Sequence, residues 1–248
     1  MKVLIGHTGF VGSILTESMS FDLLLNRSNI ELLHGIECDI ICCGLPAEKW
    51  KINLNPEIDY LNTLKLISDV KKAKVNSFKL ISTIDVFSNP NNVNEDTIPE
   101  PTNLAYSNNR YLFEQFISET YSNHQIIRLP GLFGKGLKKN IIFDLIHSNN
   151  IDKINSDSYL QWYPMNRFTD DLLTIANHPE IKLFNFCTEP LYTKTLINEC
   201  FPNIKINDSL TSGVHYNIKT KYGNIFGSNT EYMLTAAEVL ADLKQYIK

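Results

Sequence analysis

Residues 1–12, MKVLIGHTGFVG, decide the fold. The apolar run 2–5 ends in glycine and leads directly into residues with helical spacing, which is typical of a buried parallel strand followed by a helix. Gly6, Gly9 and Gly12 form the pattern GxxGxxG at the turn between them. A dinucleotide-binding turn needs glycine because the turn is tight, the backbone approaches a pyrophosphate, and the helix packs closely on the strand. The pattern therefore predicts such a turn, the alternative being a tight turn without a ligand.

The residues after the second strand bear on which dinucleotide binds. An NAD site usually has an acidic residue there, whereas this chain has Asn26, Arg27 and Ser28. An arginine can form a two-pronged contact with a 2′-phosphate, so we expect NADP(H), with NAD(H) as the alternative. The other interpretation of Arg27 is a solvated surface arginine. The residues expected to bind the cofactor are Gly6, Thr8, Gly9, Phe10, Val11, Gly12, Asn26, Arg27, Ser28, Cys43 and Gly44.

Strands and helices alternate along the chain, which predicts an α/β fold with a doubly wound parallel sheet (Rossmann-like). We expect a dinucleotide-binding domain over residues 1–135. Residues 136–248 should form a small substrate-binding part that returns strands or helices to the main sheet. Expected strands are 2–6, 21–26, 39–44, 78–83 and 125–129, and expected helices are 10–20, 56–74, 105–122, 140–148, 169–178, 193–200 and 235–247. The helix 56–74 has one apolar stripe: Ile58, Leu61, Leu64, Ile67 and Val70. Residues 27–37 are too few for a normal crossover helix.

Composition excludes several classes of protein. The net charge of −4 argues against a broad nucleic-acid-binding face. No run of 18 apolar residues is present, so we expect no membrane span, and the N-terminus enters a strand without a signal peptide, so we expect a cytoplasmic protein. Five irregularly spaced cysteines argue against a disulfide framework, and the scattered histidines predict no metal site.

Four motifs together resemble the extended short-chain dehydrogenase/reductases, the NAD(P)-dependent epimerase/dehydratase family that mostly acts on nucleotide sugars. They are GHTGFVG (6–12), LISTIDVF (80–87), AYSNNR (105–110) and RLPGLFG (128–134). The resemblance covers residues 1–171 well and the rest loosely. It implies that Thr83 and Tyr106 are catalytic, and that Tyr106, residue 110 and Leu129 contact the cofactor. The family has lysine where this chain has Arg110.

The chemistry of this pair also follows from the residues themselves. Tyr106 and Arg110 are four apart on an expected helix and therefore share a face. A nearby cation should lower the pKa of the tyrosine, so that the phenol can exchange a proton with a substrate at neutral pH. The Thr83 hydroxyl would hold the substrate oxygen, and the resemblance implies that Arg110, like the family's lysine, would also donate to the cofactor ribose. We expect a working but altered site. The alternatives are a disabled pair in a cofactor-binding shell, or a pair on a solvated helix face.

The residues after Thr83 bear on the reaction. Sugar dehydratases of this family have an Asp-Glu pair there, whereas this chain has Ile84 and Asp85, and isoleucine cannot carry a proton. Asp85 is either an acid/base, as in some relatives, or a cap at the end of the strand. Reduction of a keto group on a nucleotide sugar needs only a hydride, a proton from Tyr106 and a hydroxyl. Epimerisation through transient oxidation is the nearest alternative, and a catalytically impaired cofactor sensor or scaffold is the other.

Further expectations concern the partners. The substrate is a nucleotide sugar lying between the two parts of the chain, where Thr83, Asp85, Asn140 and Arg167 would bind it. Asn140 follows two lysines that could meet a diphosphate, although a solvated helix start is the other interpretation. Arg167 lies in a segment that resembles the phosphate-binding segment of the family. The resemblance also implies a homodimer through the long helices, including the one with Tyr106.

Overall fold

Six strands form one sheet in the order β10-β6-β4-β3-β1-β2 in the computed structural model, which describes residues 1–206 and 211–248. From β1 the chain proceeds to β2 on one side and then to β3, β4 and β6 on the other, which confirms the predicted doubly wound sheet. The strands are β1 (Lys2–Ile5), β2 (Leu23–Leu25), β3 (Glu37–Cys42), β4 (Lys74–Thr83), β6 (His124–Leu129) and β10 (Leu183–Asn185).

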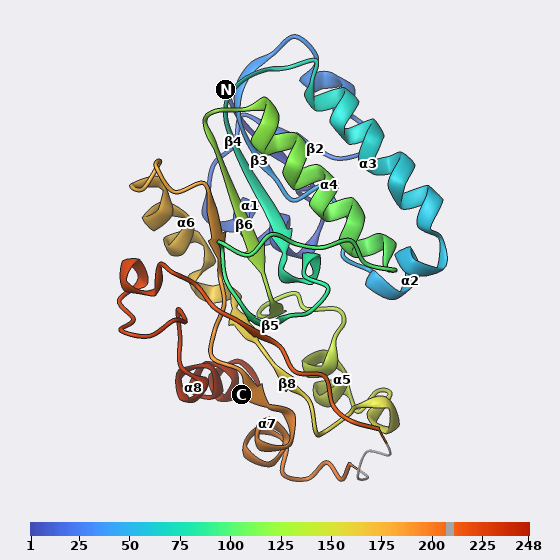
Figure 1. The fold of residues 1–248 in the computed structure, drawn as a ribbon, viewed down its shortest axis with the longest axis vertical. Helices are drawn as coiled ribbons and strands as arrows, with labels where there is room; N and C mark the ends of the chain where they lie inside the picture. The colour runs from blue at the N-terminus through green and yellow to red at the C-terminus, as the bar shows by residue number, and fades with distance from the viewer. Residues whose placement is uncertain (207–210) are drawn as a thin grey trace. The chain divides into compact units, whose positions relative to one another are not determined.

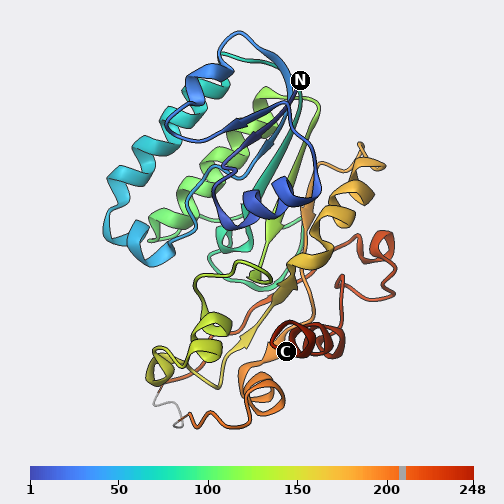
Figure 2. The same ribbon diagram turned by 180° about the vertical axis from the view of Figure 1, so that it is seen from behind.

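Helices cover both faces of this sheet. Helices α3 (Pro56–Val70) and α4 (Ala105–Thr120) lie on one face, and α1 (Phe10–Ser18) lies on the other (Figures 1 and 2). Phe78 of β4 and Phe113 of α4 are fully buried and meet edge to face, with ring centroids 6.3 Å apart. Burial of such apolar side chains between the layers is the main stabilising contribution to this arrangement.

The connection from β2 to β3 is as short as the sequence predicts. It contains only the 3₁₀ turn η1 (Ile30–Leu33) in place of a crossover helix. Ile30 and Leu33 are buried in the same core as β1 and β3, so the turn covers this part of the sheet with two side chains.

Helix α3 buries a polar face over its first half and exposes its apolar residues there. It ends at Val70, and the first half of its apolar stripe faces solvent, with Ile58 and Leu61 62% and 63% exposed. Asp59 and Thr63 are buried instead. The apolar stripe therefore does not mark the buried side over the first half of α3, because that side carries the Asp59 carboxylate with its partner on α4. A second helix, α2 (Lys49–Leu54), was not predicted.

The chain divides into two compact units that are each built from separate segments. Unit 1 comprises residues 1–88, 98–128 and 175–184, and unit 2 comprises residues 89–97, 129–174 and 185–248. This division differs from a single boundary after residue 135, since residues 129–135 lie in unit 2 and residues 175–184 return to unit 1 with most of β10.

Unit 2 has its own core, centred on residues such as Phe133, Trp162 and Leu196. The four helices predicted in this part of the sequence are present within a few residues of the expected bounds. The remaining helices and strands are β5 (Asn91–Val93), β7 (Gly131–Phe133), α5 (Ile141–His147), β8 (Tyr159–Leu160), β9 (Trp162–Pro164), α6 (Phe168–Ala176), β11 (Leu191–Tyr192), α7 (Thr193–Cys200), β12 (Asn217–Ile218) and α8 (Ala236–Tyr246).

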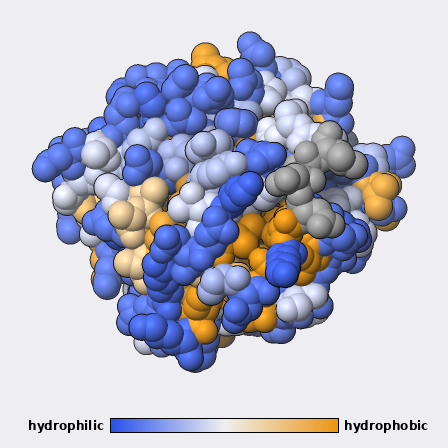
Figure 3. All heavy atoms as spheres, turned by 90° about the horizontal axis from the view of Figure 1, so that it is seen from below, coloured by the Kyte–Doolittle hydropathy of each residue, from blue (hydrophilic) through white to orange (hydrophobic). Residues whose placement is uncertain are grey.

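The surface mixes hydrophilic and hydrophobic side chains. Figure 3 shows orange hydrophobic areas surrounded by blue hydrophilic ones on the face seen from below. Among the described residues, no helix combines the length and the apolar character needed to cross a membrane.

Candidate active site

Each of the three glycines after β1 lies in a different structural environment. Gly6 has φ of +89°, and a Cβ there would lie 2.5 Å from the carbonyl oxygen of Cys43. A Cβ on Gly12 would lie 2.2 Å from the carbonyl oxygen of Gly6, so helix α1 packs directly on the turn. At Gly9 the nearest such atom, the carbonyl oxygen of Gly6, would be 3.4 Å away, so a Cβ there would meet the turn only at ordinary van der Waals distance. These are the requirements for a tight turn, close packing and an approaching ligand.

The start of α1 is suited to an anion. Gly9 is its N-cap residue, no side chain caps the helix, and its first turn has no acidic residue. The first N–H groups of a helix have no acceptor within the helix and carry partial positive charge. Phe10, Val11 and Gly12, which supply these groups, therefore fit the pyrophosphate of a dinucleotide, with Thr8 in the turn before them.

The carboxyl ends of β2 and β3 lie beside this turn. Gly6 donates its N–H to Leu25 at the end of β2 (2.7 Å), and a Cβ on Gly6 would also meet the Gly44 nitrogen after β3. Asn26 accepts the backbone N–H and the hydroxyl of Ser28, which closes a small turn. Arg27 in this turn is exposed and has no ion-pair partner among the described residues.

Tyr106, Thr83 and Asp85 lie together, at the start of α4 and the end of β4. Tyr106 is 7% exposed, and its phenol lies beside the Thr83 side chain, which lowers the pKa of the phenol. The Thr83 hydroxyl oxygen also accepts the backbone N–H of Asp85 at 3.2 Å. Thr83, and not Asp85, is thus the residue that caps the 3₁₀ turn η2 (Ile84–Val86) at the end of the strand.

Arg110 stacks on Tyr106, as the spacing on the helix predicts, but its donors point into the protein. The centre of its guanidinium lies 4.3 Å from the centroid of the Tyr106 ring. Its nitrogens donate to the carboxylate of Asp59 on α3 and to the carbonyl of Pro46. Asp59 also accepts the Asn109 amide at 2.8 Å, and both charged side chains are almost completely buried. Arg110 is therefore held by the protein, which weakens the expectation that it donates to the cofactor ribose.

The balance of effects on Tyr106 corrects one expectation. Burial raises the pKa of the phenol above its usual value, because the phenolate would lose its hydration. Arg110 and the Thr83 hydrogen bond lower this pKa, while the charges of Asp85 and Asp59 raise it. Arg110 thus acts in the expected direction, but burial outweighs it. The phenol keeps its proton at neutral pH and is suited to donate it.

Three polar residues near Tyr106 were missed in the sequence. They are Lys49, Asn53 and Asp59, which all precede the motif with the tyrosine by more than 40 residues. Asn53 of α2 accepts the backbone N–H of Tyr106 at 3.0 Å, and Lys49 donates to Asp85 at 2.9 Å. The only signal in the sequence was Asp59 itself, a carboxylate flanked by the apolar positions of an expected helix.

The other predicted site residues lie in unit 2. Asn140 is the N-cap of α5, where its side chain accepts the N–H of Phe143 and donates to the carbonyl of Leu132. Arg167 donates two hydrogen bonds to Asp171, so part of its guanidinium is already used. Leu129 ends β6 and is buried.

Known proteins resemble this chain in structure and not in sequence. No protein-family model matches the chain, and no curated protein matches it in sequence. Solved structures do match: a dTDP-4-dehydrorhamnose reductase from Yersinia enterocolitica has 17% identity and a TM-score of 0.70, over 99% of this chain and 98% of that one. The enzyme of the same name from Bacillus anthracis, in complex with NADP, has 15% identity and a TM-score of 0.73, over 99% and 96%. A UDP-N-acetylglucosamine 4-epimerase from Bacillus cereus has 16% identity and a TM-score of 0.66, over 100% and 98%.

The chain shares its fold with these reductases and epimerases. The fold that the four motifs imply is therefore confirmed over nearly the whole chain. At such low identity the likeness establishes the fold, and the reaction must be argued from the site.

Proposed function

We propose that the protein reduces a keto group on a nucleotide-linked sugar with NADP(H), and that Tyr106 donates the proton. The observation that carries this proposal is the buried phenol of Tyr106, whose pKa is raised by burial, beside Thr83 at the carboxyl end of β4. Ligands of open parallel sheets bind at this edge, where the glycine turn after β1 also lies. An acid that holds its proton at neutral pH suits reduction, in which the substrate oxygen must gain a proton.

The residues of the chain divide the work as follows. A bound nicotinamide cofactor would supply the hydride, and the glycine turn at Gly6, Gly9 and Gly12 would hold its pyrophosphate. Tyr106 donates its proton to the substrate oxygen as negative charge develops there. The Thr83 side chain lies beside the phenol and would stabilise the phenolate that remains by donating its hydroxyl proton. Arg110, stacked on the ring, stabilises the same charge through space.

The preference for NADP(H) is supported by Arg27. It is the exposed cation at the end of β2, and the residues on either side of it are both uncharged. The Bacillus anthracis reductase was solved with NADP. NAD(H) remains the alternative cofactor.

Epimerisation through transient oxidation is the second candidate function, favoured by the 4-epimerases among the structural neighbours. In that reaction Tyr106 would first act as a base, which its raised pKa opposes. A cofactor sensor without catalysis is the third candidate, and the arginine at position 110 is its main support.

The sugar nucleotide is expected to meet residues of unit 2. We keep Asn140 and Arg167 as proposed substrate contacts. Asn140 retains one amide proton beyond its two hydrogen bonds in the capping motif, and the Arg167 side chain remains partly exposed beside Asp171. Replacement of Arg167 by methionine should raise the KM for a nucleotide sugar more than it lowers kcat.

Oxidation of NADPH in the presence of a panel of nucleotide-linked keto sugars tests the reaction. Turnover should appear with at least one member, such as dTDP-4-dehydrorhamnose, and Tyr106→Phe should reduce it about 10²- to 10⁴-fold while NADPH still binds. A Tyr106→Phe variant as active as the wild type would refute the assignment. Interconversion of two sugars without net oxidation of NADPH would favour the epimerase.

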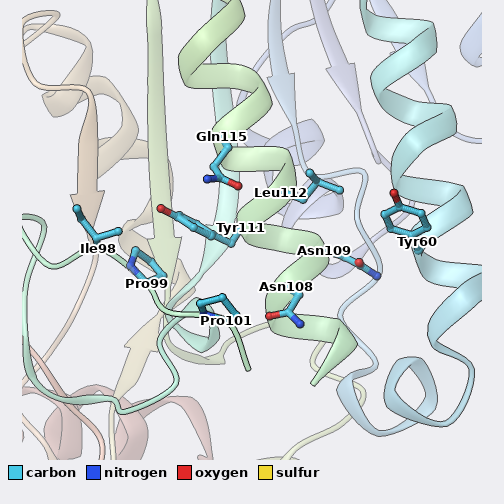
Figure 4. Close-up of a pocket in the computed structure, with 9 residues that line it drawn as sticks. All are labelled: Tyr60, Ile98, Pro99, Pro101, Asn108, Asn109, Tyr111, Leu112 and Gln115. Carbon is cyan, nitrogen blue, oxygen red and sulfur yellow. The ribbon is translucent and has the colours of Figure 1, made fainter. Parts of the chain in front are cut away.

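We also propose a homodimer through α3 and α4. Several large hydrophobic side chains of α2 and α3 are exposed to solvent: Trp50, Leu54, Ile58, Tyr60, Leu61 and Leu64. An open groove beside them has a volume of about 520 Å³, and Tyr111 of α4 extends across it towards Ile98 and Pro99 (Figure 4). Exposed apolar surface of this kind is typical of an interface. Light scattering should give twice the chain mass for the wild type and the monomer mass for Leu61→Glu.

A further inference from the structure

The short helix α2 brings a lysine to the active site from outside the catalytic motif. Lys49 is the first residue of α2, and its Nζ donates to Oδ1 of Asp85 at 2.9 Å. The same helix contacts α4 and holds the backbone N–H of Tyr106 through Asn53. One helix of six residues thus contacts both Asp85 and the start of the helix that carries the tyrosine.

The charged groups around Tyr106 form two pairs. Arg110, on the same helix, is paired with Asp59 of α3. Asp85 of η2 is paired with Lys49 of α2. Thr83 of β4 faces the phenol as a neutral hydroxyl. The other lysine of α2, Lys51, is exposed, and its ion pair is with Glu48 (Nζ to Oε2, 3.7 Å) rather than with Asp85. Each anion that acts on Tyr106 therefore has a cation in contact with it.

We propose that Lys49 is a positioning residue, which holds the Asp85 carboxylate in place beside Thr83 and Tyr106 and offsets its charge. This inference rests on the proposed reduction by Tyr106 and adds a residue to it. When Tyr106 gives up its proton, negative charge develops on the phenol oxygen. An unpaired carboxylate nearby would oppose that charge, and the ammonium of Lys49 reduces this opposition.

Four variants test the proposal: Lys49→Met removes the cation, Lys49→Arg keeps it, Asp85→Asn removes the anion, and Lys51→Met is the matched control on the same helix. With dTDP-4-dehydrorhamnose and NADPH, Lys49→Met should lower kcat about tenfold and leave KM within about twofold, because a partly exposed ion pair has a modest effect. Lys49→Arg should restore most of the rate, and Lys51→Met should match the wild type.

A second readout does not depend on turnover. In protein labelled with tyrosine carrying ¹³C at Cζ, one of the eleven tyrosine resonances belongs to Tyr106 and is identified by its loss in Tyr106→Phe. Lys49→Met and Asp85→Asn should move this resonance at pH 8, since both change the charge beside the phenol. Lys49→Arg and Lys51→Met should leave it near its original position.

The two readouts separate this proposal from the function. If the wild type turns over and Lys49→Met changes neither kcat nor the Tyr106 resonance, the role of Lys49 is refuted while the reductase stands. Equal changes in Lys49→Met and Lys51→Met also refute it, because the effect would then come from net charge. If no sugar is reduced, the proposed function fails, and the Tyr106 resonance alone tests the role of Lys49. A shift of that resonance in Lys49→Met and not in Lys51→Met supports the pairing of Lys49 with Asp85. The absence of such a shift refutes the pairing.

Discussion

Replacement of Asp59 by asparagine should strongly destabilise unit 1. The Asp59 carboxylate and the Arg110 side chain are 4% and 3% exposed, so solvent screens neither charge. Asparagine has nearly the same shape but no charge, and it leaves the guanidinium buried with only the Pro46 carbonyl and a weaker acceptor. At an effective dielectric constant of about 20, two charges about 4 Å apart interact by about 4 kcal/mol. Loss of one partner from a buried ion pair typically costs about 3–5 kcal/mol.

Urea unfolding followed by circular dichroism measures this loss. A change of about 3–5 kcal/mol is a third or more of the free energy of unfolding of an ordinary domain, so the midpoint should fall clearly. The buried Trp162 of unit 2 reports by fluorescence whether that unit unfolds separately. Glu199→Gln is the control, because it breaks an exposed pair with Lys244 and should leave the midpoint unchanged.

A double variant tests whether the unpaired buried charge is the cause of this destabilisation. Asp59→Leu with Arg110→Met removes both charges and fills the space with apolar atoms, which is often near neutral for stability. It should therefore be more stable than Asp59→Asn although it changes more atoms. If the free energy of unfolding of Asp59→Asn is within about 1 kcal/mol of the wild-type value, the buried ion pair stabilises unit 1 less than its burial implies.

Three further predictions concern the cofactor and pH. Gly9→Ala should fold normally but bind NADPH at least about tenfold more weakly. Gly12→Ala should also lower the melting temperature, because a Cβ at position 12, unlike one at position 9, overlaps the backbone. Equal melting temperatures for the two variants would contradict this difference. Arg27→Ala should weaken NADPH about tenfold in a titration calorimeter and leave NADH unchanged, since only NADPH carries the 2′-phosphate; a parallel loss for both cofactors would remove Arg27 from the site. Because burial raises the pKa of Tyr106, the rate of reduction should not fall as the pH rises from 6 to 9. The reverse oxidation needs the phenolate, so its rate should increase over that range. A rate of reduction that falls with a midpoint near pH 7 would show that the pKa of the phenol is not raised.

The parts of the fold that could be predicted are those set by neighbours in the sequence. The turn after β1 depends on three glycines within seven residues, and helices such as α7 depend on local periodicity. Tyr106 and Arg110 meet because they are one turn apart on α4. In each case the residues that determine the structure lie within one or two helical turns of one another.

The parts that could not be predicted depend on partners far along the chain. Asp59 meets Arg110 across 51 residues, and Lys49 meets Asp85 across 36. Periodicity identified the stripe on α3 but not the side that is buried, because the buried face of that helix is set by an ion pair with α4. The direction in which the pKa of Tyr106 is shifted also depends on burial, which only the folded chain determines.

The division of the chain into interleaved segments has a consequence for its synthesis. Strand β6 is complete by residue 129, yet its neighbour β10 is made only when the ribosome reaches residues 183–185. Until then, the outer edge of β6 has backbone groups without a strand to pair with, and such edges promote association between nascent chains. Truncation before residue 185 should therefore yield insoluble protein, and a chaperone that shields this edge during translation should raise the yield of the full-length chain.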